Sequence, residues 1–415
     1  ELRGVARALV APDQLGGGYG FLIMIYSNEA EGETINFQYY DFDEDVVYDL
    51  SETVEFESDM VYGSLVNPFV FNVSLGIDID ISLDSGWNWL SSNVYIDDMG
   101  LNSFLESLED GSALYIKSQD AYADYYAGFG WFGPLTAIDN KYMYKLNMNY
   151  EDSIQLTGTP VDVSGTSIPL NQGWNWIGYT PQVQLDINTA LSNLQPDHAL
   201  YIKSQDAYSD YYEGFGWFGP LSNLNPFQGY LLNMVLPDDL VYSTGFSLSH
   251  IQNDNNFMWE LNIHDYEFNG SATIEILLDG QKINSDNYQL GAFNGTKCVG
   301  QVKPLIFPLT GDYVFPLMMH GNENSDKITF KLYDTSSDKY LEINNTLEFY
   351  NNMHLGNGFI PIVIEANDII PDEIEVSYPY PNPFNPSTSI NFRLPSSSEV
   401  NIKAYDIMGR QVSTI

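Results

Sequence analysis

The chain has 415 residues, 44% of them hydrophobic, and its 56 acidic and 15 basic residues give a net charge of −41. At roughly 100–200 residues per domain, this length predicts three or four domains. The negative charge excludes nucleic acid and anionic lipid as partners, because both repel it, and no apolar run reaches the ~18 residues of a transmembrane helix. The single cysteine, Cys298, excludes an internal disulfide.

Residues 1–75 predict a strand-rich module, which we name A1. Its stretch TINFQYYD alternates apolar and polar side chains, which is typical of a half-buried strand. Residues 18–74 also align with residues 311–366, and the matched positions include Asn28 with Asn322, Phe37 with Phe330, and Gly63 with Gly356. Residues 245–296 precede the later copy and have no counterpart before the earlier one. We therefore expect A1 to be truncated and the chain to be part of a longer protein.

Two further modules, B1 at 76–160 and B2 at 161–243, repeat one another. The stretch ALYIKSQDAY occurs unchanged at 113–122 and at 199–208, and each copy also contains GWNW. A repeat of this length matches a small domain rather than a solenoid unit. The sequence therefore predicts tandem copies of one domain.

Each B module predicts one short amphipathic helix, at 101–109 and at 186–195. Apolar side chains recur there at the i, i+3, i+4 and i+7 positions of one helix face. They are Leu101, Phe104, Leu105 and Leu108 in B1, and Ile187, Ala190, Leu191 and Leu194 in B2. Strand-like segments flank both helices, so we expect each B module to be a small α+β unit with one helix on a curved sheet.

Residues 244–366 predict a complete second A module, A2. The stretch KITFKLYD repeats the strand pattern of A1, and IEILLDGQKI places Asp279 and Gly280 between two strand-like runs, which indicates a hairpin. We expect A2 to be an antiparallel β-sandwich. The whole chain is then mainly β and multi-domain, with β-sandwich modules flanking two tandem α+β repeats.

Residues 367–415 predict a stiff, proline-rich linker followed by two alternating strands. This stretch resembles the type A C-terminal sorting domain of type IX secretion cargo. The residues that carry the resemblance include Pro381, Asn382, Pro383, Phe384, Asn385, Pro386, Gly409 and Arg410. In that family the domain is a small β-sandwich with more strands than this stretch holds. The resemblance therefore implies a partial β-sandwich sorting domain that the type IX secretion machinery recognises.

Catalytic and metal motifs do not stand out in the sequence. It contains neither H-E-x-x-H nor G-x-S-x-G, and GGGYG at 16–20 is better explained as a turn than as a phosphate loop, because no lysine follows it. The acidic stretches at 41–45 and 77–80 could hold Ca²⁺, but they lack the spacing of an EF-hand and fit a solvated surface better. We expect no catalytic residue, no metal site and no cofactor other than Ca²⁺ at these acids.

The aromatic loop of each B module is the strongest candidate for a binding site. Aromatic faces stack on the apolar faces of sugars, so the loops predict a glycan-binding edge. Its residues are Tyr125, Tyr126 and Trp131 in B1, and Tyr211, Tyr212 and Trp217 in B2. The alternative is that the rings form the core, because a small domain must bury its large side chains. The exposure of the rings decides between the two interpretations.

Two functions follow from these features. The first is a non-catalytic part of a secreted or cell-surface multi-module protein, used for adhesion or for binding a matrix, a glycan or another surface polymer. The alternative is the accessory C-terminal region of a secreted peptidase or glycoside hydrolase whose catalytic domain lies upstream. The sorting-domain resemblance places either protein outside a Gram-negative bacterium, released or on its outer surface. We expect the chain of 415 residues not to be an enzyme.

Overall fold

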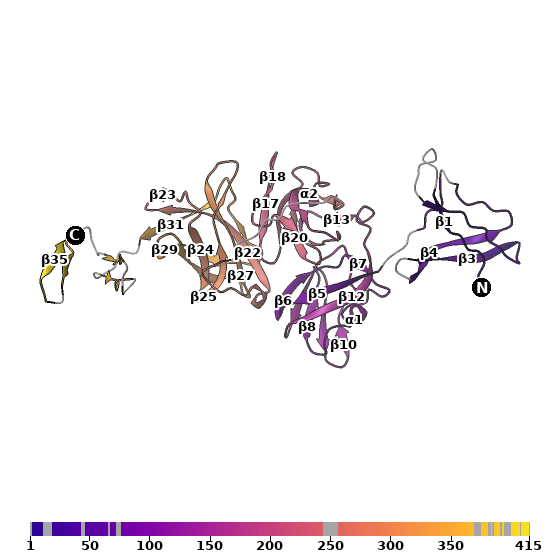
Figure 1. Cartoon of the computed structure of the whole chain (residues 1–415), viewed down its shortest axis with the longest axis horizontal. Helices are drawn as coiled ribbons and strands as arrows, with labels where there is room; N and C mark the ends of the chain where they lie inside the picture. The colour runs from indigo at the N-terminus through magenta and orange to yellow at the C-terminus, as the bar shows by residue number, and fades with distance from the viewer. Residues whose placement is uncertain are drawn as a thin grey trace.

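Figure 1 shows the computed structural model of the chain. The structure describes residues 2–10, 19–42, 46–64, 67–71, 76–243, 256–368, 375–380, 383, 386–390, 392–393, 400–406 and 408–414. Strands account for 50% of it and helices for 3%. The predicted mainly-β class is therefore confirmed.

A1 contains two antiparallel strand pairs. Strand β1 (Ala8–Val10) pairs with β2 (Tyr19–Phe21), and β3 (Glu31–Asp41) pairs with β4 (Val46–Glu57). Ile35 is buried on β3, and Phe37 and Tyr39 on the same face are half-buried. The alternating pattern thus predicted this strand correctly.

The turn after β4 has the same geometry as a turn in A2. Asp59 and Asn352 occupy equivalent positions with φ of 65° and 60°, and Gly63 and Gly356 do so with φ of 70° and 68°. In both turns a methionine sulfur accepts a hydrogen bond of 3.4 Å from the backbone N–H three residues earlier. Since residues other than glycine rarely adopt positive φ, these shared values agree with the sequence alignment of A1 and A2.

B1 is built from two antiparallel sheets. One has the strand order β10-β9-β8-β11-β6 and the other the order β5-β12-β7. The strands are β5 (Ile77–Leu83), β6 (Gly86–Leu90), β7 (Val94–Tyr95), β8 (Ala113–Lys117), β9 (Tyr122–Tyr126), β10 (Gly130–Phe132), β11 (Tyr144–Met148) and β12 (Asp152–Pro160). Leu90, Phe104, Ile116 and Leu146 are buried in the core of this module.

B2 repeats the five-stranded sheet of B1. Its order is β14-β20-β16-β17-β18, so these strands hold the positions of β6, β11, β8, β9 and β10; β13 pairs with β21, and β15 with β19. The strands are β13 (Ile168–Leu170), β14 (Gly173–Gly178), β15 (Leu185–Asp186), β16 (Ala199–Lys203), β17 (Tyr208–Tyr212), β18 (Gly216–Phe218), β19 (Asn223–Leu224), β20 (Gly229–Met234) and β21 (Asp238–Leu240). The two B sheets therefore have one strand order.

The helices of the B modules are shorter than predicted. Helix α1 (Leu101–Phe104) and helix α2 (Ile187–Ala190) are single turns, so the limits 101–109 and 186–195 were wrong. The next residues, Leu105 and Leu191, leave helical geometry with ψ of 19° and 13°. A single turn gains few hydrogen bonds for the residues it fixes. The first three apolar residues of each predicted face are nevertheless buried, and Leu108 and Leu194 are half-buried. This burial stabilises a helix that is too short to be stable alone.

A2 consists of one ten-stranded sheet preceded by the 3₁₀ helix η2 (Ile263–Asp265). Eight strands follow the order β25-β24-β28-β29-β31-β22-β27-β26, and β23 and β30 pair with β22. The strands are β22 (Phe268–Leu278), β23 (Gln281–Lys282), β24 (Tyr288–Asn294), β25 (Lys297–Val302), β26 (Leu305–Ile306), β27 (Tyr313–Gly321), β28 (Asp326–Asp334), β29 (Lys339–Phe349), β30 (His354–Leu355) and β31 (Ile362–Asp368).

Two features of A2 bear on the sequence predictions. The hairpin is confirmed, because β22 pairs with β23 around Asp279 and Gly280, whose φ values of 50° and 77° suit a tight hairpin turn. The expectation of a purely antiparallel sheet was wrong, since β30 and β31 run parallel to β22. Strands from the two ends of the sheet pack together, because a Cβ on Gly300 of β25 would lie 2.3 Å from the Met318 carbonyl oxygen of β27.

The tail forms two short strand pairs, β32 (Glu375–Val376) with β33 (Phe392–Arg393) and β34 (Lys403–Tyr405) with β35 (Gln411–Thr414). A turn closes the second pair, and in it the side chain of Arg410 donates a hydrogen bond of 2.8 Å to Asp406. Gly409 in this turn has a φ of 76°. Of the predicted sorting motif, Pro381, Asn382, Phe384 and Asn385 lie outside the described residues.

Candidate functional site

B1 and B2 hold each other through equivalent contacts in both directions. The Gln205 side chain accepts from the Trp89 backbone N–H at 3.0 Å and donates to the Trp87 carbonyl at 2.8 Å. Its counterpart in B1, Gln119, makes the same pair of bonds with Trp176 at 2.9 Å and Trp174 at 3.1 Å. Reciprocal contacts of this kind are the mark of a two-fold related pair. The tandem copies are therefore related by a pseudo-two-fold axis.

Backbone pairing repeats the same symmetry. Leu90 of B1 forms an antiparallel bridge with Gln228 of B2, and Ile177 of B2 forms the equivalent bridge with Tyr142 of B1. In the alignment of the two copies, Leu90 corresponds to Ile177 and Tyr142 corresponds to Gln228. The GWNW strand of each copy, β6 or β14, therefore reaches the neighbouring copy at its end.

A2 covers the five-stranded sheet of B2 with its strand β22. The Tyr201 hydroxyl donates to Ser271 Oγ at 2.8 Å, and the hydroxyls of Tyr208 and Thr273 share a hydrogen bond of 2.7 Å. Both tyrosines are fully buried and pack against Met318 of β27. This contact joins residues that are far apart in the sequence into one aromatic interface, and Figure 1 shows β22 and β27 beside the B modules.

The outer part of the same B2 face is also occupied. The Gly358 backbone N–H donates to the Tyr212 hydroxyl at 2.7 Å, and the Tyr212 ring centroid lies 4.9 Å from that of Phe307. Asp210 pairs with His354 at 2.9 Å. Burial raises the pKa of Asp210, and the hydrogen bond from His354 opposes that rise. The aromatic loop of B2 is therefore part of a domain interface.

Three lysines meet where B1, B2 and A2 come together. Lys203 is fully buried and donates to Asn269 Oδ1 at 2.7 Å and to Asn352 Oδ1 at 2.8 Å. Lys145 donates to the Glu267 carbonyl at 2.9 Å, and Lys117 pairs with the Glu267 carboxylate. A2 therefore supplies an acceptor to each of these three lysines.

Tryptophan rings line this junction. The Lys145 Nζ lies 4.1 Å from the Trp89 ring centroid and 5.2 Å from that of Trp176. Burial, followed by repulsion from Lys117, lowers the pKa of Lys145 to about 7. Burial also lowers the pKa of Lys203 well below its usual value, with a smaller contribution from Lys145. The cation–π interactions with the aromatic rings partly offset the cost of removing these ammonium groups from water.

The six predicted contact residues lie in different environments in the two copies. In B1, Tyr126 is 52% exposed, while Tyr125 donates a hydrogen bond of 2.8 Å to Asp110 and is half-buried. The half-buried Trp131 ring packs against Tyr125 at 5.2 Å. In B2, Tyr212 and Trp217 are buried, and Tyr211 packs against Trp217 at 5.4 Å. The predicted edge is thus partly accessible in B1 and largely covered in B2.

The most exposed rings of the B1 loop were not among the predicted contact residues. Phe129 is 92% exposed and Phe132 is 77% exposed, and Tyr122 at 47% contrasts with 1% for its counterpart Tyr208. Phe132 shares its face of the sheet with Tyr122 and Tyr126, because side chains alternate along paired strands. Predicting how β9 pairs with β10 would have shown from the sequence that Tyr122, Tyr126 and Phe132 share one face of the sheet. We name the set Tyr122, Tyr126, Phe129 and Phe132 the B1 aromatic face.

A small cavity lies on the other side of this B1 sheet from the B1 aromatic face, next to helix α1. It has a volume of about 200 Å³ and is lined by residues that include Leu105, Glu109, Tyr125 and Trp131. Ligand pockets usually measure roughly 300–1,000 Å³. The cavity therefore fits a protruding group of a larger ligand better than a whole small molecule.

Carboxylates do not assemble into a metal site in the described ranges, which contain no group of three histidine, cysteine or acidic residues in ligating arrangement. Asp78 of the 77–80 stretch instead accepts a hydrogen bond of 2.6 Å from Thr157. Residues 43–45 of the other acidic stretch lie outside the described residues. None of the helices in the described part of the chain has the length and apolar character needed to cross a bilayer.

Comparisons of the chain with models of protein families, with curated proteins and with solved structures found no match. The candidate site is therefore interpreted from its own residues.

Proposed function

We propose that this chain is a non-catalytic, adhesive part of a secreted or cell-surface multi-module protein. The observation that carries the proposal is the B1 aromatic face, in which four large rings remain exposed although the B2 counterparts of Tyr122 and Tyr126 are buried. An exposed cluster of aromatic rings on a folded module marks an interaction site rather than a core. With A2 on B2, this face of B1 is presented to the surroundings.

The chemistry of the face suits an extended glycan or a similar surface polymer. Flat rings offer stacking surfaces for the apolar faces of sugars, and Asp124, between Tyr122 and Tyr126 on β9, offers an acceptor for sugar hydroxyls. Base stacking on aromatic rings contributes roughly 1–3 kcal/mol per ring, and we expect sugar stacking not to exceed this. A single face then binds weakly, and a polymer that engages many copies of the protein binds tightly through avidity.

The proposed context comes from the tail and from the module order. We propose that residues 367–415 belong to a type IX sorting domain that directs the protein across the outer membrane of a Gram-negative bacterium. We also propose that A1 and A2 are β-sandwich modules that flank the two tandem α+β copies. The support for these proposals is the resemblance of the tail, the repeated sequences and the turn geometry that A1 shares with A2.

Binding to insoluble polysaccharides tests the proposal. The purified chain is mixed with cellulose, chitin, mannan and peptidoglycan, and the bound fraction is measured by sedimentation. We expect at least one polymer to retain the chain, and Phe129→Ala with Phe132→Ala to weaken that retention about tenfold or more. The matched control, Phe215→Ala in B2, should leave it unchanged. Retention by none of the polymers, or equal losses from both variants, would contradict the proposal.

A further inference from the structure

Six B2 side chains of the face that A2 covers have identical counterparts in B1. The pairs, with the B1 residue first, are Tyr115 and Tyr201, Lys117 and Lys203, Tyr122 and Tyr208, Asp124 and Asp210, Tyr126 and Tyr212, and Phe132 and Phe218. The two copies also share the backbone register of strands β8 and β9 with β16 and β17, because Tyr115 lies opposite Asp124 just as Tyr201 lies opposite Asp210. B1 therefore carries the same set of contact groups as B2.

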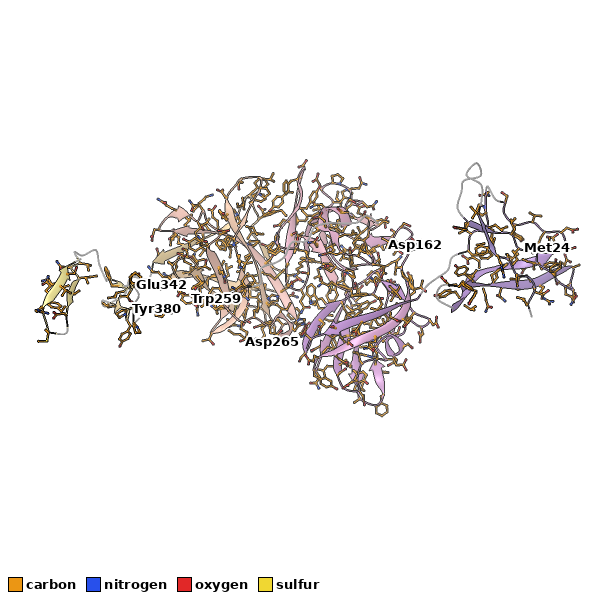
Figure 2. All side chains as sticks on the ribbon, viewed as in Figure 1. Met24, Asp162, Trp259, Asp265, Glu342 and Tyr380 are labelled. Carbon is orange, nitrogen blue, oxygen red and sulfur yellow. The ribbon has the colours of Figure 1, made fainter. Side chains whose placement is uncertain are left out.

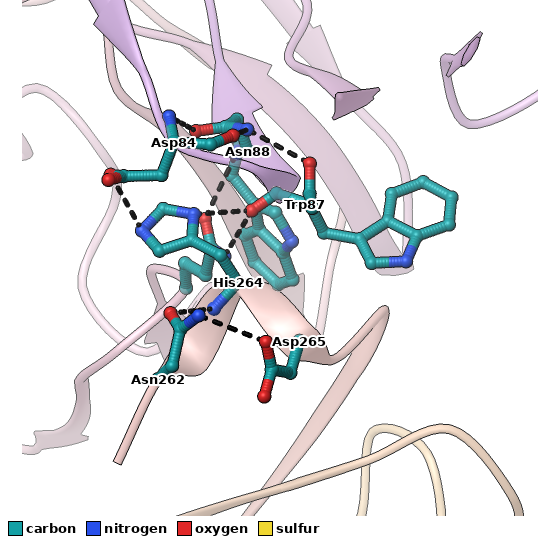
Figure 3. Close-up of polar contacts among 9 residues, drawn as sticks. Asp84, Trp87, Asn88, Asn262, His264 and Asp265 are labelled. Carbon is teal, nitrogen blue, oxygen red and sulfur yellow. Dashed lines mark hydrogen bonds and ion pairs between the residues drawn. The ribbon is translucent and has the colours of Figure 1, made fainter. Parts of the chain in front are cut away.

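A2 nevertheless rests on B2 and reaches over the pseudo-two-fold axis to only a few residues of B1. In the close-up of Figure 3, the His264 ring contacts the Trp87 carbonyl at 2.6 Å and pairs with the Asp84 carboxylate at 3.1 Å. Figure 2 places the neighbouring Asp265 at the edge of A2 that adjoins B1. Lys145 and Lys117 make further cross-axis contacts, with the Glu267 carbonyl and the Glu267 carboxylate.

The two copies differ at two of the B1 positions whose side chains make cross-axis contacts, Asp84 and Lys145. Asn171 of B2 takes the place of Asp84, and Leu231 of B2 takes the place of Lys145. The backbone around Asp84 and Asn171 is alike, since each accepts a side-chain amide hydrogen bond of 2.7 Å from the asparagine four residues later. The difference is therefore chemical: a docked A2 finds the Asp84 carboxylate and the Lys145 ammonium group across the axis only when it lies on B2, whereas the Lys117 position carries a lysine in both copies.

The mirror position is open at the point where η2 would pack. A Cβ on Gly86 of B1 would lie 2.2 Å from the His264 carbonyl oxygen, because A2 packs closely there. Its B2 counterpart, Gly173, has nothing within 4 Å of the same point. The two glycines have nearly the same backbone, with φ of 93° and 89°. The surface that η2 would need in the mirror position is thus formed and open.

We propose that B1 is a second docking site for A2 of the same chain, and that Asp84 and Lys145 are the residues that direct A2 to B2. Glu267 and Phe268 of A2 contact Lys117 and Lys145, which lie between the two docking sites. A2 therefore fills only one of the two sites at a time. Residues 244–255 join B2 to A2, and a chain of this length spans up to about 40 Å. Movement of A2 to B1 covers Tyr122, Tyr126 and Phe132 and uncovers their B2 counterparts.

Exchange of the specifying residues tests this assignment. The variant carries Asp84→Asn, Asn171→Asp, Lys145→Leu and Leu231→Lys in a Cys298→Ala background. Exposed cysteines report the position of A2: Ile360→Cys is combined with Glu213→Cys for B2 or with Ala127→Cys for B1, and a short bismaleimide links them. Mass spectrometry of the monomer band measures each link.

The parent chain should link position 360 to position 213 and not to 127. In the exchange variant we expect the 127–360 link to rise about tenfold or more and the 213–360 link to fall. A folded exchange variant that links only 213 to 360 would overturn the proposal, and so would a 127–360 link found only in the dimer band. Circular dichroism establishes that the variants are folded.

A pair of single substitutions gives an independent answer if the fourfold variant does not fold. Gly86→Ala places a methyl group against His264, whereas Gly173→Ala imposes the same backbone strain with no neighbour to meet. We expect Gly86→Ala to raise the 127–360 link several-fold and Gly173→Ala to leave it at the parent level. Equal behaviour of the two variants would contradict the assignment.

Discussion

B1 and B2 carry almost the same aromatic loop, yet Tyr126 is 52% exposed while Tyr212 is 6% exposed. The local structure does not cause the difference, because both loops follow the same strand order and both hold their second aromatic strand to an asparagine of the short helix, through Trp131 N–H to Asn102 and Trp217 N–H to Asn188. The cause is A2, which covers the aromatic face of B2 and leaves that of B1 exposed. Whether the aromatic side chains of a B module are buried thus depends on whether A2 packs against that module.

The consequence for function is that duplication has separated two roles. The B2 face contributes stability by binding A2, and the B1 face remains accessible. Identical side chains therefore give different energetic effects on substitution, so the two copies serve as internal controls for each other. Each prediction below uses a matched pair of positions.

The largest difference is expected between Tyr208→Ala and Tyr122→Ala. Tyr208 is fully buried and bonds Thr273, so its removal should lower the free energy of unfolding by about 3–5 kcal/mol, as for other large buried rings. Tyr122 is half exposed, and its removal should cost less than about 1 kcal/mol. Urea unfolding followed by fluorescence measures both. Equal losses would show that A2 does not cover B2 in solution.

A smaller effect concerns pH and the Lys145 site. The folded pKa of about 7 lies below the unfolded value of ~10.4. Between these values the unfolded chain binds more protons, so stability rises with pH, by up to about 1.4 kcal/mol per unit. Lys145→Leu, which copies Leu231 of B2, removes this contribution. Unfolding at pH 7, 8 and 9 should therefore show a shallower rise for the variant, and an unchanged slope would contradict the account.

The smallest predicted difference is between Tyr212→Phe and Tyr126→Phe. Loss of the Tyr212 hydroxyl leaves the buried Gly358 N–H without its acceptor, which should cost about 1–3 kcal/mol. The same change at the exposed Tyr126 should alter stability by less than about 0.5 kcal/mol. Thermal unfolding resolves this difference. A larger loss at Tyr126 than at Tyr212 would contradict the assignment of the covered face.

Sequence reasoning identified the parts of the fold that depend on local pattern. The β3 strand, the Asp279–Gly280 hairpin and the buried faces of the short helices were all predictable, because alternation, turn chemistry and apolar spacing are local signals. The helix lengths were overestimated, since apolar spacing continues beyond the point where the backbone leaves helical geometry. The parallel pairing of β22 with β31 joins strands about ninety positions apart, and no local pattern encodes it.

The candidate site was predictable only in part. The aromatic loops were found because they are dense and repeated, but Phe129 and Phe132 were passed over in favour of Trp131, which proved half-buried. Covering of the B2 face could not be predicted, because Tyr212 meets Gly358 across 146 positions of sequence. Two identical stretches give identical expectations from sequence, so only the position of a third module distinguishes them.

Hydroxyl-radical footprinting of the intact chain tests the central claim most directly. The peptides DAYADYYAGFGWFGPL and DAYSDYYEGFGWFGPL differ in mass, so mass spectrometry follows the two copies in one sample. We predict that Tyr122, Tyr126 and Phe132 are oxidised at least several-fold faster than Tyr208, Tyr212 and Phe218, and that the difference disappears in denaturant. Equal rates for the two peptides in the native chain would contradict the account.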